Sequence, residues 1–444
     1  MTVSPEIAIA ILLIGLMVIL LNGYPLGIMI GALALFAGLP LFGGAGTVEM
    51  LYSRMWSSLT SYDLLAVPIF IFMGEMLSRS GVAESLFGAV NTIFAKVRGG
   101  VAYAVVGIGT VLAACIGTSG SATSLLSMMS MPSMLKSGYD RRLSAGLVAG
   151  AGTLGMLIPP SLMLIVMGPI TGISVGKLFF AAFGPGLLLA SLYCANIFLV
   201  SRLRPSALPL SEVSERWLPI RAKIKLFSLS ILPALLVIFS VMAAIFFGIA
   251  PPTEAGAIGA LFATFIALFH RRLGFRIFRD VSMESVIITG KVMLMIVFCN
   301  AFVGIFVRAG GMEVVEKILM STPGGRWGIF TAIQLIILVL GGPLDWAGVV
   351  LIIVPIIMPI GVALGFDPLW WVMIVCVNLQ TSFLSPPLAT SIYIIQSTTP
   401  PEYGVTVKDV TLGMFPYMLL QVIGIVLLTV FPQIILWLPS VMIG

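Results

Sequence analysis

The composition of this chain excludes a soluble globular protein. Its 444 residues are 59% hydrophobic, their mean hydropathy is +1.16, and only 9% are charged, whereas a soluble domain carries about 25% charged residues. The same numbers exclude a disordered chain and a coiled coil. Long, unbroken apolar runs predict an all-α polytopic membrane protein, because a helix satisfies its own backbone groups in lipid. The runs do not alternate as barrel strands do.

Few residues are available for enzyme chemistry. His270 is the single histidine, and it stands beside two arginines at the end of an apolar run. The four cysteines lie in separate apolar segments, without the spacing of metal ligands or redox pairs (Cys115, Cys194, Cys299 and Cys376). We therefore expect no enzymatic activity and no organic cofactor.

The basic loops predict which helix ends face the cytoplasm. Residues 201–225 hold six basic and two acidic side chains, and residues 271–284 hold four and two, which together account for the net charge of +6. Basic loops mark the cytoplasmic side of a membrane protein. The charge thus indicates contact with anionic lipid and not with nucleic acid.

The first half of the chain begins with predicted N-terminal scaffold helices over 1–62 and a first transport repeat over 63–177. An arm helix over 79–98 leads to a segment, 101–135, with basic residues on both flanks. This segment is too short for two full crossings of about 20 residues each. We therefore predict a re-entrant hairpin there, with Gly117–Ser121 at its tip.

A broken helix is predicted over 143–170, because Pro159 and Pro160 interrupt an apolar run. Two consecutive prolines remove two N–H donors and clash with the preceding turn. Such a break leaves free carbonyls at one half-helix end and free N–H groups at the other. Residues 178–285 are then predicted to hold scaffold helices and the basic cytoplasmic loops.

The second half repeats this plan with the opposite orientation. Five sequence matches keep their order at offsets of 223 to 229 residues; among them Gly117 recurs at Gly341–Gly342 and Pro159–Pro160 at Pro386–Pro387. The loop after the first hairpin has a net charge of +2 and its counterpart −1, which predicts inversion. The predicted second half comprises an inverted transport repeat 2 over 286–397, with a hairpin over 326–363 and a broken helix over 368–397, and then a C-terminal helix over 398–444.

The hairpin tips and helix breaks are the candidate binding sites. Inverted repeats with Gly/Pro-interrupted segments indicate a secondary transporter with its site near the membrane midplane. A tip that meets a break supplies carbonyls and hydroxyls for a small hard cation such as Na⁺, and half-helix N-termini suit a carboxylate. The candidate residues are Gly117, Thr118, Ser119, Ser121, Pro159, Pro160, Ser161, Gly341, Gly342, Asp345, Asn378, Thr381, Ser382 and Ser385, of which Gly117, Ser119, Gly341 and Asp345 are expected to hold Na⁺.

Several of these residues also have a structural interpretation. Thr118, Ser119 and Ser121 could cap half-helices or permit close packing. Asp345 could serve only as an N-cap, although a carboxylate at membrane depth is costly and by default indicates function.

The motifs resemble those of a known family, the large membrane subunit of TRAP (tripartite ATP-independent periplasmic) transporters, over nearly the full length. The matching stretches are Val67-Pro-Ile-Phe-Ile-Phe-Met-Gly-Glu75, Gly117-Thr-Ser-Gly-Ser-Ala-Thr123, Met131-Pro-Ser-Met-Leu-Lys-Ser-Gly-Tyr139, Gly152-Thr-Leu-Gly-Met-Leu-Ile-Pro-Pro-Ser161, Pro252-Thr-Glu-Ala255 and Leu344-Asp345.

The resemblance implies uptake of an organic acid anion, driven by a Na⁺ gradient, across the bacterial inner membrane. It implies two protein partners, a periplasmic substrate-binding protein and a small four-helix membrane subunit, here expected to be a separate polypeptide. It also implies an elevator mechanism, in which hairpins and broken helices move together against a scaffold. One departure is Ser385-Pro-Pro-Leu-Ala389, where the family usually has Thr-Pro-Pro-Val-Gly; this leaves the backbone path after Pro387 open.

Two other functions remain open at this point. A stand-alone Na⁺- or H⁺-coupled carboxylate symporter of a related inverted-repeat fold would take up substrate without a binding protein. A non-transporting membrane scaffold or proton-channel subunit would need a string of intramembrane Lys, Glu and His residues, which this chain lacks. An intramembrane serine protease would need a base, and His270 lies at a membrane edge.

Overall fold

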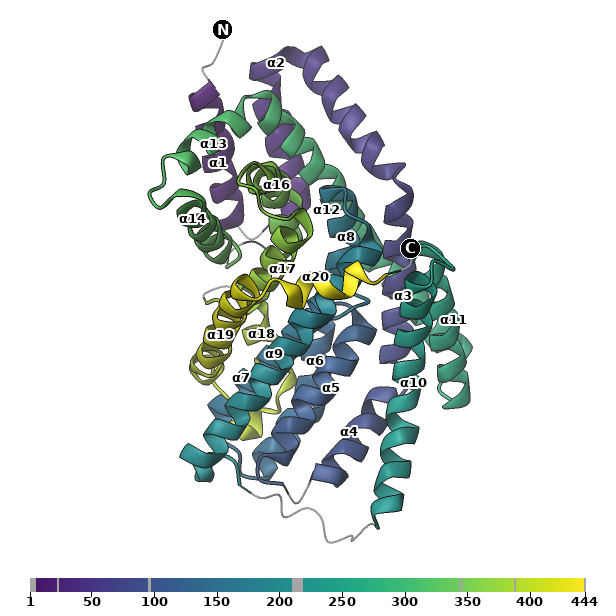
Figure 1. Ribbon diagram of the computed structural model, residues 1–444. Helices are drawn as coiled ribbons and strands as arrows, with labels where there is room; N and C mark the ends of the chain where they lie inside the picture. Colours follow the sequence, from purple (N-terminus) through teal and green to yellow (C-terminus); the bar gives the residue numbers. More distant parts are fainter. Residues whose placement is uncertain are drawn as a thin grey trace.

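The computed structural model describes the chain apart from residues 1–4, 22–23, 95–96, 210–218, 343, 345, 387–388 and 443–444. Its described residues form helices and connecting turns without strands, so the all-α prediction is confirmed (Figure 1). The helices are α1 (Pro5–Leu21), α2 (Leu26–Leu59), η1 (Tyr62–Leu65), α3 (Ala66–Ser78), α4 (Val82–Phe94), α5 (Gly100–Ile116), α6 (Ser119–Lys136), α7 (Arg141–Thr153), η2 (Leu154–Met156), α8 (Leu162–Thr171), α9 (Val175–Leu203), α10 (Ile220–Phe246), α11 (Pro252–Phe269), α12 (Phe275–Arg308), α13 (Gly311–Met320), α14 (Gly325–Leu340), α15 (Trp346–Gly348), η4 (Val349–Ile353), α16 (Val354–Ala363), α17 (Pro368–Leu384), α18 (Thr390–Thr398), α19 (Val407–Val430) and α20 (Gln433–Ser440).

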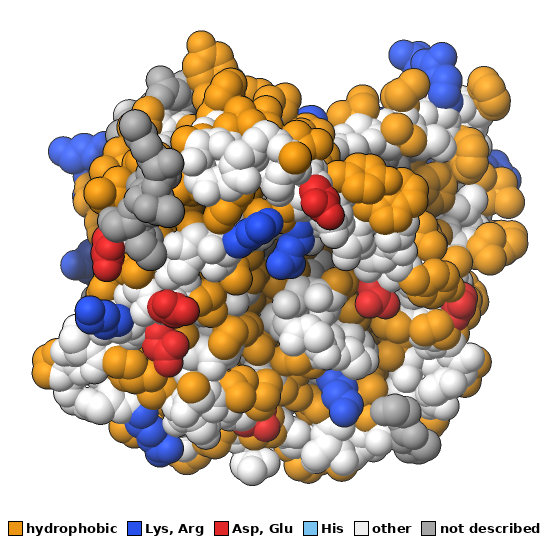
Figure 2. Space-filling view, turned by 90° about the horizontal axis from the view of Figure 1, so that it is seen from above, with side chains coloured by type: hydrophobic (Ala, Val, Ile, Leu, Met, Phe, Trp, Pro, Cys, Tyr) orange, Lys and Arg blue, Asp and Glu red, His pale blue; other side chains and the backbone are white. Residues whose placement is uncertain are grey.

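The outer surfaces of the helices are those of a membrane protein. Among the described residues seven helices are long and apolar enough to cross a membrane, or nine if each of two bent pairs is one span. Phe239 on α10, Phe265 on α11 and Leu419 on α19 are all more than half exposed, and Figure 2 shows hydrophobic side chains over much of the face seen from above. Water would disfavour so much exposed apolar surface, which instead fits lipid.

The two halves of the fold contain the same series of elements. An arm (α4 or α13), an antiparallel helical pair (α5–α6 or α14–α16) and an interrupted helix (α7–α8 or α17–α18) follow in each half. Figure 1 places α4 and α13 at opposite ends of the molecule, as an inverted repeat requires. Equivalent glycines take the left-handed conformation, which favours glycine, in three pairs: Gly81 and Gly310, Gly99 and Gly324, Gly138 and Gly365.

Equivalent aspartates begin the two interrupted helices. Asp140 accepts a hydrogen bond from Leu143 N (3.0 Å), and Asp367 accepts one from Trp370 N (2.9 Å). Each carboxylate satisfies one of the free N–H groups of a first turn. The structural repeat therefore extends to the capping of the helices.

The helices form two packed groups. In the first, α2 lies along α12, and α3 packs on α11 and α12, with α10 beside α11 and α4. In the second, α9 packs on α5, α7 and α17, the helices of the repeats, and α19 packs on α7, α17 and α9. Within the predicted scaffold range 178–285, α9 packs on α5, α7 and α17, whereas α10 packs on α11 and also on α4 and α5 of the first repeat.

One range differs from the predicted arrangement, and one long helix is kinked. The C-terminal range, predicted as one helix, holds α19 and a separate α20, because Pro432 disfavours a helical conformation at Phe431, whose φ and ψ are −120° and 71°. Within α2, Gly43 has φ 72° and ψ 168° and kinks the helix. Both segments of α2 then contact α12, through Gly27 against Met295 and through Arg54 against Gly304.

Candidate functional site

The tip of the first hairpin meets the first helix break. Gly117, with φ 71°, turns the chain between α5 and α6. Its carbonyl accepts a hydrogen bond from Leu162 N at 3.2 Å, at the start of α8. A Cβ at Gly117 would lie 3.4 Å from Pro160 O. The predicted contact between Gly117–Ser121 and the break is therefore present.

The break itself is built from the predicted prolines. η2 ends α7, the Pro159–Pro160 peptide bond is cis, and Ser161 precedes α8 in an extended conformation (φ −119°, ψ 134°). The Ser161 hydroxyl donates a hydrogen bond to Met156 O and so joins the two sides of the break. At the start of α8, one of the N–H groups that a helix leaves free, that of Leu162, is directed to the hairpin tip.

Two buried hydroxyls at this junction lack a partner among the described residues. Ser119 is 2% exposed and Thr123 is fully buried, and neither side-chain oxygen makes a hydrogen bond. Thr123 faces α7 at Gly152, where a Cβ would lie 2.0 Å from its Oγ1. Buried polar groups normally have partners, so these oxygens are available to a ligand. Thr118 and Ser121 lie nearby but are only partly buried.

The tip of the second hairpin meets the second interrupted helix. A Cβ added at Gly341 would lie 1.8 Å from Ser382 Oγ and 2.5 Å from Ser382 Cβ, so only glycine permits this approach. Ser382 is 4% exposed, and its hydroxyl has no partner among the described residues. Gly342, beside Gly341, is partly buried and makes no such close contact.

The other candidates on α17 are engaged within the protein. Asn378 Nδ2 donates to the backbone and side-chain oxygens of Gln334 on α14, both at 2.8 Å. Thr381 Oγ1 lies 2.5 Å from Asn378 O and 3.0 Å from Asn378 Oδ1, and Ser385 Oγ donates to Thr381 O at 2.8 Å. These side chains shape the helix end and tie α17 to the hairpin.

Part of the second site falls outside the described residues. Asp345, the one candidate carboxylate, lies there, as does Pro387. Ala389, at the position where the family usually has glycine, has φ −53° and ψ 107°. Any residue can adopt this conformation. The replacement of the family's glycine by Ala389 therefore causes no backbone strain at this position.

The two interrupted helices touch at a position that the sequence analysis missed. Thr153 Oγ1 lies 3.2 Å from Gln380 Oε1, and these residues are 227 positions apart, the offset of the proline pairs. Gln421 Nε2 on α19 donates to Thr153 Oγ1 (3.2 Å) and to Tyr193 OH on α9 (2.8 Å). All four side chains are fully buried. In the sequence, the glutamine Gln380 within an apolar run could have indicated this contact, because glutamine is usually exposed.

The site offers neutral oxygens and backbone dipoles. Among the described residues no group of three or more His, Cys, Asp or Glu side chains could hold a metal ion. Carbonyl and hydroxyl oxygens are ligands for hard cations, and half-helix N-termini attract anions. The arrangement therefore has the chemistry to hold a small cation and a carboxylate together.

Comparison with known proteins identifies the family. The family model for the DctM component of the tripartite ATP-independent periplasmic transporters matches residues 13–434. The chain belongs to this family. It is a TRAP large permease and a multi-pass membrane protein, and not an enzyme.

The related TRAP permeases are named after different substrates. The chain is 29% identical over 403 residues (89% of it and 90% of the relative) to the C4-dicarboxylate TRAP transporter large permease protein DctM of Pseudomonas aeruginosa. It is 26% identical to the ectoine TRAP transporter large permease protein TeaC of Halomonas elongata (95% and 96% covered). It is 25% identical to the sialic acid TRAP transporter permease protein SiaT of Haemophilus influenzae (94% and 68% covered).

A solved structure shares the fold. The crystal structure of the Alcanivorax borkumensis YdaH transporter, described as having an unusual topology, matches with a TM-score of 0.62 at 13% identity. The match covers 88% of this chain and 90% of that one. At this identity the likeness concerns the fold alone.

Proposed function

We propose that this permease subunit imports an organic acid anion, driven by a Na⁺ gradient, through an elevator movement. One observation carries the proposal. In each inverted repeat a hairpin tip touches an interrupted helix, and a buried hydroxyl there, Ser119 or Ser382, has no partner among the described residues. Paired sites of this kind, at discontinuous helices, are where secondary transporters bind substrate and coupling ion.

The coupling ion in this proposal is Na⁺. The described candidate residues are Gly, Thr, Ser, Pro and Asn, and none of these side chains titrates near neutral pH. Protons need a titratable carrier, whereas Na⁺ needs only oxygens. We propose one ion at Gly117 and Ser119, and a second at Gly341 and Asp345.

The moving body in this proposal consists of the repeats with α9 and α19. Of these two helices, α9 packs on α5, α7 and α17 and α19 packs on α7 and α17, and the Tyr193–Gln421–Thr153 hydrogen bonds join them through buried side chains. The helices α2, α3 and α10–α12 would remain as the scaffold. This assignment moves α9 from the scaffold group of the sequence analysis to the transport group.

The relatives' names support the substrate class in this proposal, and the partners are those that the resemblance to the family implies. Three relatives are named after C4-dicarboxylates, sialic acid and ectoine, which carry a carboxylate, and a fourth is named after isethionate, a sulfonate. The anionic group of an organic acid is therefore the shared chemistry, and we propose a carboxylate for this chain. We propose that a periplasmic binding protein delivers the acid and that a small four-helix membrane subunit braces the scaffold, in the bacterial inner membrane.

The test combines melting and transport. The purified chain is melted in Na⁺, K⁺ or choline at equal ionic strength, alone and with the small subunit. A ligand bound only by the folded state at about twenty times its dissociation constant stabilises by roughly 1.8 kcal/mol. We expect a Na⁺-specific rise in melting temperature that Ser119→Ala and Ser382→Ala each reduce.

Ser130→Ala is the matched control for Ser119→Ala. Ser130 lies on the same helix, α6, and is fully buried, but its hydroxyl donates to Leu126 O. Ser130→Ala should leave the Na⁺-specific rise in melting temperature unchanged. An equal loss in Ser130→Ala, or a Na⁺ response unchanged in both site variants, would refute the site. Proteoliposomes containing all three components then test uptake of succinate, sialic acid and ectoine under a Na⁺ gradient.

A further inference from the structure

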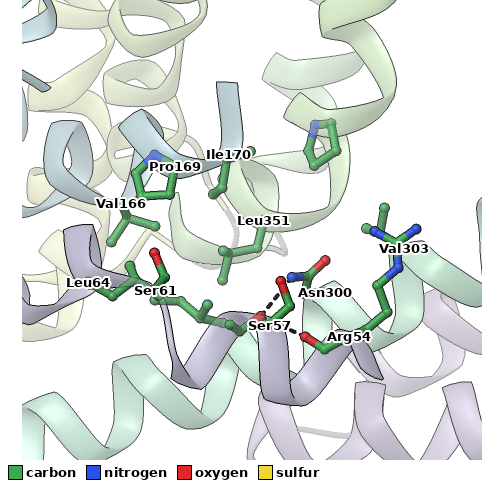
Figure 3. A pocket seen from close by; sticks show the side chains of 13 residues that line it. Arg54, Ser57, Ser61, Leu64, Val166, Pro169, Ile170, Asn300, Val303 and Leu351 are labelled. Carbon is green, nitrogen blue, oxygen red and sulfur yellow. Dashed lines mark hydrogen bonds between the residues drawn. The ribbon is translucent and has the colours of Figure 1, made fainter. Parts of the chain in front are cut away.

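A cavity of about 330 Å³ lies between the scaffold helices and the repeats. Figure 3 shows Ser61, Ser57 and Arg54 along one edge, from α2 and the turn that follows it, with Asn300 of α12 beside Ser57. Val166 and Pro169 of α8 and Leu351 of the second hairpin lie opposite. The cavity is therefore separate from the hairpin tips.

The polar edge of the cavity is held in place by a short chain of hydrogen bonds. Asn300 Nδ2 donates to Ser58 Oγ at 2.7 Å, and Ser58 Oγ donates to Arg54 O at 3.0 Å. These bonds fix the second segment of α2 against α12. Arg54 and Ser57 are three residues apart, which brings their side chains to one face of the helix.

Arg54 supplies the only charge among the described residues that line this cavity. No carboxylate in the described part of the chain forms an ion pair with it. Its side chain lies over Gly304, where an added Cβ would be 3.1 Å from Arg54 Cγ and 3.2 Å from Nε. The hydroxyls of Ser57 and Ser61 also make no hydrogen bond within the described residues.

We propose that this cavity, the Arg54 site, binds the carboxylate of the transported acid before it reaches the helix breaks, an inference that rests on the proposed function. The Arg54 guanidinium can hold a carboxylate with two parallel hydrogen bonds, and Ser57 and Ser61 can donate their hydroxyl protons to it. Ligand cavities range from about 300 to 1,000 Å³, so the volume favours a small organic acid.

The two walls of the cavity belong to different packed groups. The donors all come from α2, α12 and the turn after α2, whereas α8 and the second hairpin contribute apolar side chains. An acid held by Arg54 thus stays on the scaffold side while the repeats move past it. In this arrangement the Arg54 site sets the apparent affinity for external acid, and the helix breaks carry the acid across.

A reporter cysteine on the opposite wall tests the site directly. Ile170→Cys lines the cavity without being a proposed donor. Its labelling rate is measured with an anionic sulfonatoethyl and a cationic trimethylammonioethyl methanethiosulfonate, with the chain lacking the reporter as background. We expect the anionic reagent to be favoured, and Arg54→Gln to lower that preference by about tenfold.

Protection by acids identifies the ligand chemistry. The labelling rate of Ile170→Cys is measured in the presence of succinate, lactate, isethionate or sialic acid and is compared with the rate in chloride or phosphate at equal ionic strength. We expect at least one organic acid to slow labelling, and Arg54→Gln to raise the protecting concentration about tenfold or more. Arg54→Lys should restore part of the effect, because it keeps the charge but not the planar fork. Arg326→Gln, at an arginine that stacks on Trp327 outside the cavity, should change nothing.

Uptake measured in parallel separates this inference from the proposed function. Arg54→Gln should raise the KM for external acid about tenfold, with kcat within about threefold of wild type. An unchanged KM, no protection by any organic acid, or equal protection by chloride and phosphate would overturn the Arg54 site. A wild-type protein without Na⁺-driven uptake would instead refute the proposed function, and the labelling experiment would still decide whether the site exists.

Discussion

The contact between Gly341 and Ser382 gives the sharpest test of the second tip. In Gly341→Ala the new Cβ would start 2.5 Å from Ser382 Cβ and 2.9 Å from Ile337 O, where side-chain rotation offers no relief. Carbon atoms in contact prefer about 3.5 to 4.0 Å, so the tip and α17 must separate by roughly 1 Å. Overpacking of this kind costs about 1–3 kcal/mol, and it displaces the proposed ion ligands.

The neighbouring glycine is the matched control. A Cβ at Gly342 would come no closer than 3.5 Å to another atom, Val339 O, so Gly342→Ala adds the same methyl group without a clash. We expect Gly341→Ala to lower the melting temperature and the Na⁺ affinity, the latter by about tenfold or more if the ligands move by that distance. Gly342→Ala should keep both.

The assay is a Na⁺ titration of the melting temperature, followed by initial rates of Na⁺-driven uptake. The two variants are compared at matched expression and in the same detergent. If Gly341→Ala and Gly342→Ala show the same Na⁺ dependence and the same uptake, the close approach of the second tip to α17 has no part in ion binding. The proposed second site would then be in the wrong place.

Three further predictions follow from the same geometry. Asp345→Asn should reduce Na⁺-driven uptake at unchanged expression in membranes, and normal uptake would remove Asp345 from the ion site. Gln421→Leu removes the amide donor from the buried Tyr193 and Thr153 oxygens, so it should lower stability by about 1–3 kcal/mol and keep the Na⁺-specific shift; loss of the shift in a chain of normal stability would contradict a purely structural role. Uptake under a fixed Na⁺ gradient should vary less than about twofold between pH 6 and 8, because the described candidate residues are Gly, Thr, Ser, Pro and Asn, whose side chains do not titrate in this range; a tenfold change would indicate proton coupling.

The repeat and the helix breaks could be predicted because they depend on local residues. Prolines cannot continue a helix, and left-handed turns select glycine, so Pro159–Pro160 and the paired glycines are visible in the sequence. The predicted bounds of the first hairpin, 101–135, differ by one residue at each end from α5 and α6, which span Gly100–Lys136.

Contacts between distant segments could not be predicted in the same way. The apolar sequence of Val175–Leu203 does not show which helices it packs on. In the fold it packs on α5, α7 and α17, and its Phe180 also contacts Phe246 of α10. Arg54 stands in an ordinary polar stretch at the end of α2, and only the fold brings α12 and α8 to it. Gln380 was overlooked in favour of Thr381 and Ser382 beside it, although it forms the contact between the repeats.

The Thr153–Gln380 contact bears on how the two proposed ion sites act together. The residues occupy equivalent positions in α7 and α17, just before each break, so the contact lies where the two repeats meet. Gln421 and Tyr193 bind the same cluster from α19 and α9. Because uncharged, fully buried side chains have no water to replace a lost partner, separating the two helices would leave several polar groups unpaired. We therefore expect the two breaks to move together, and an ion bound at one tip to affect the other tip through this contact.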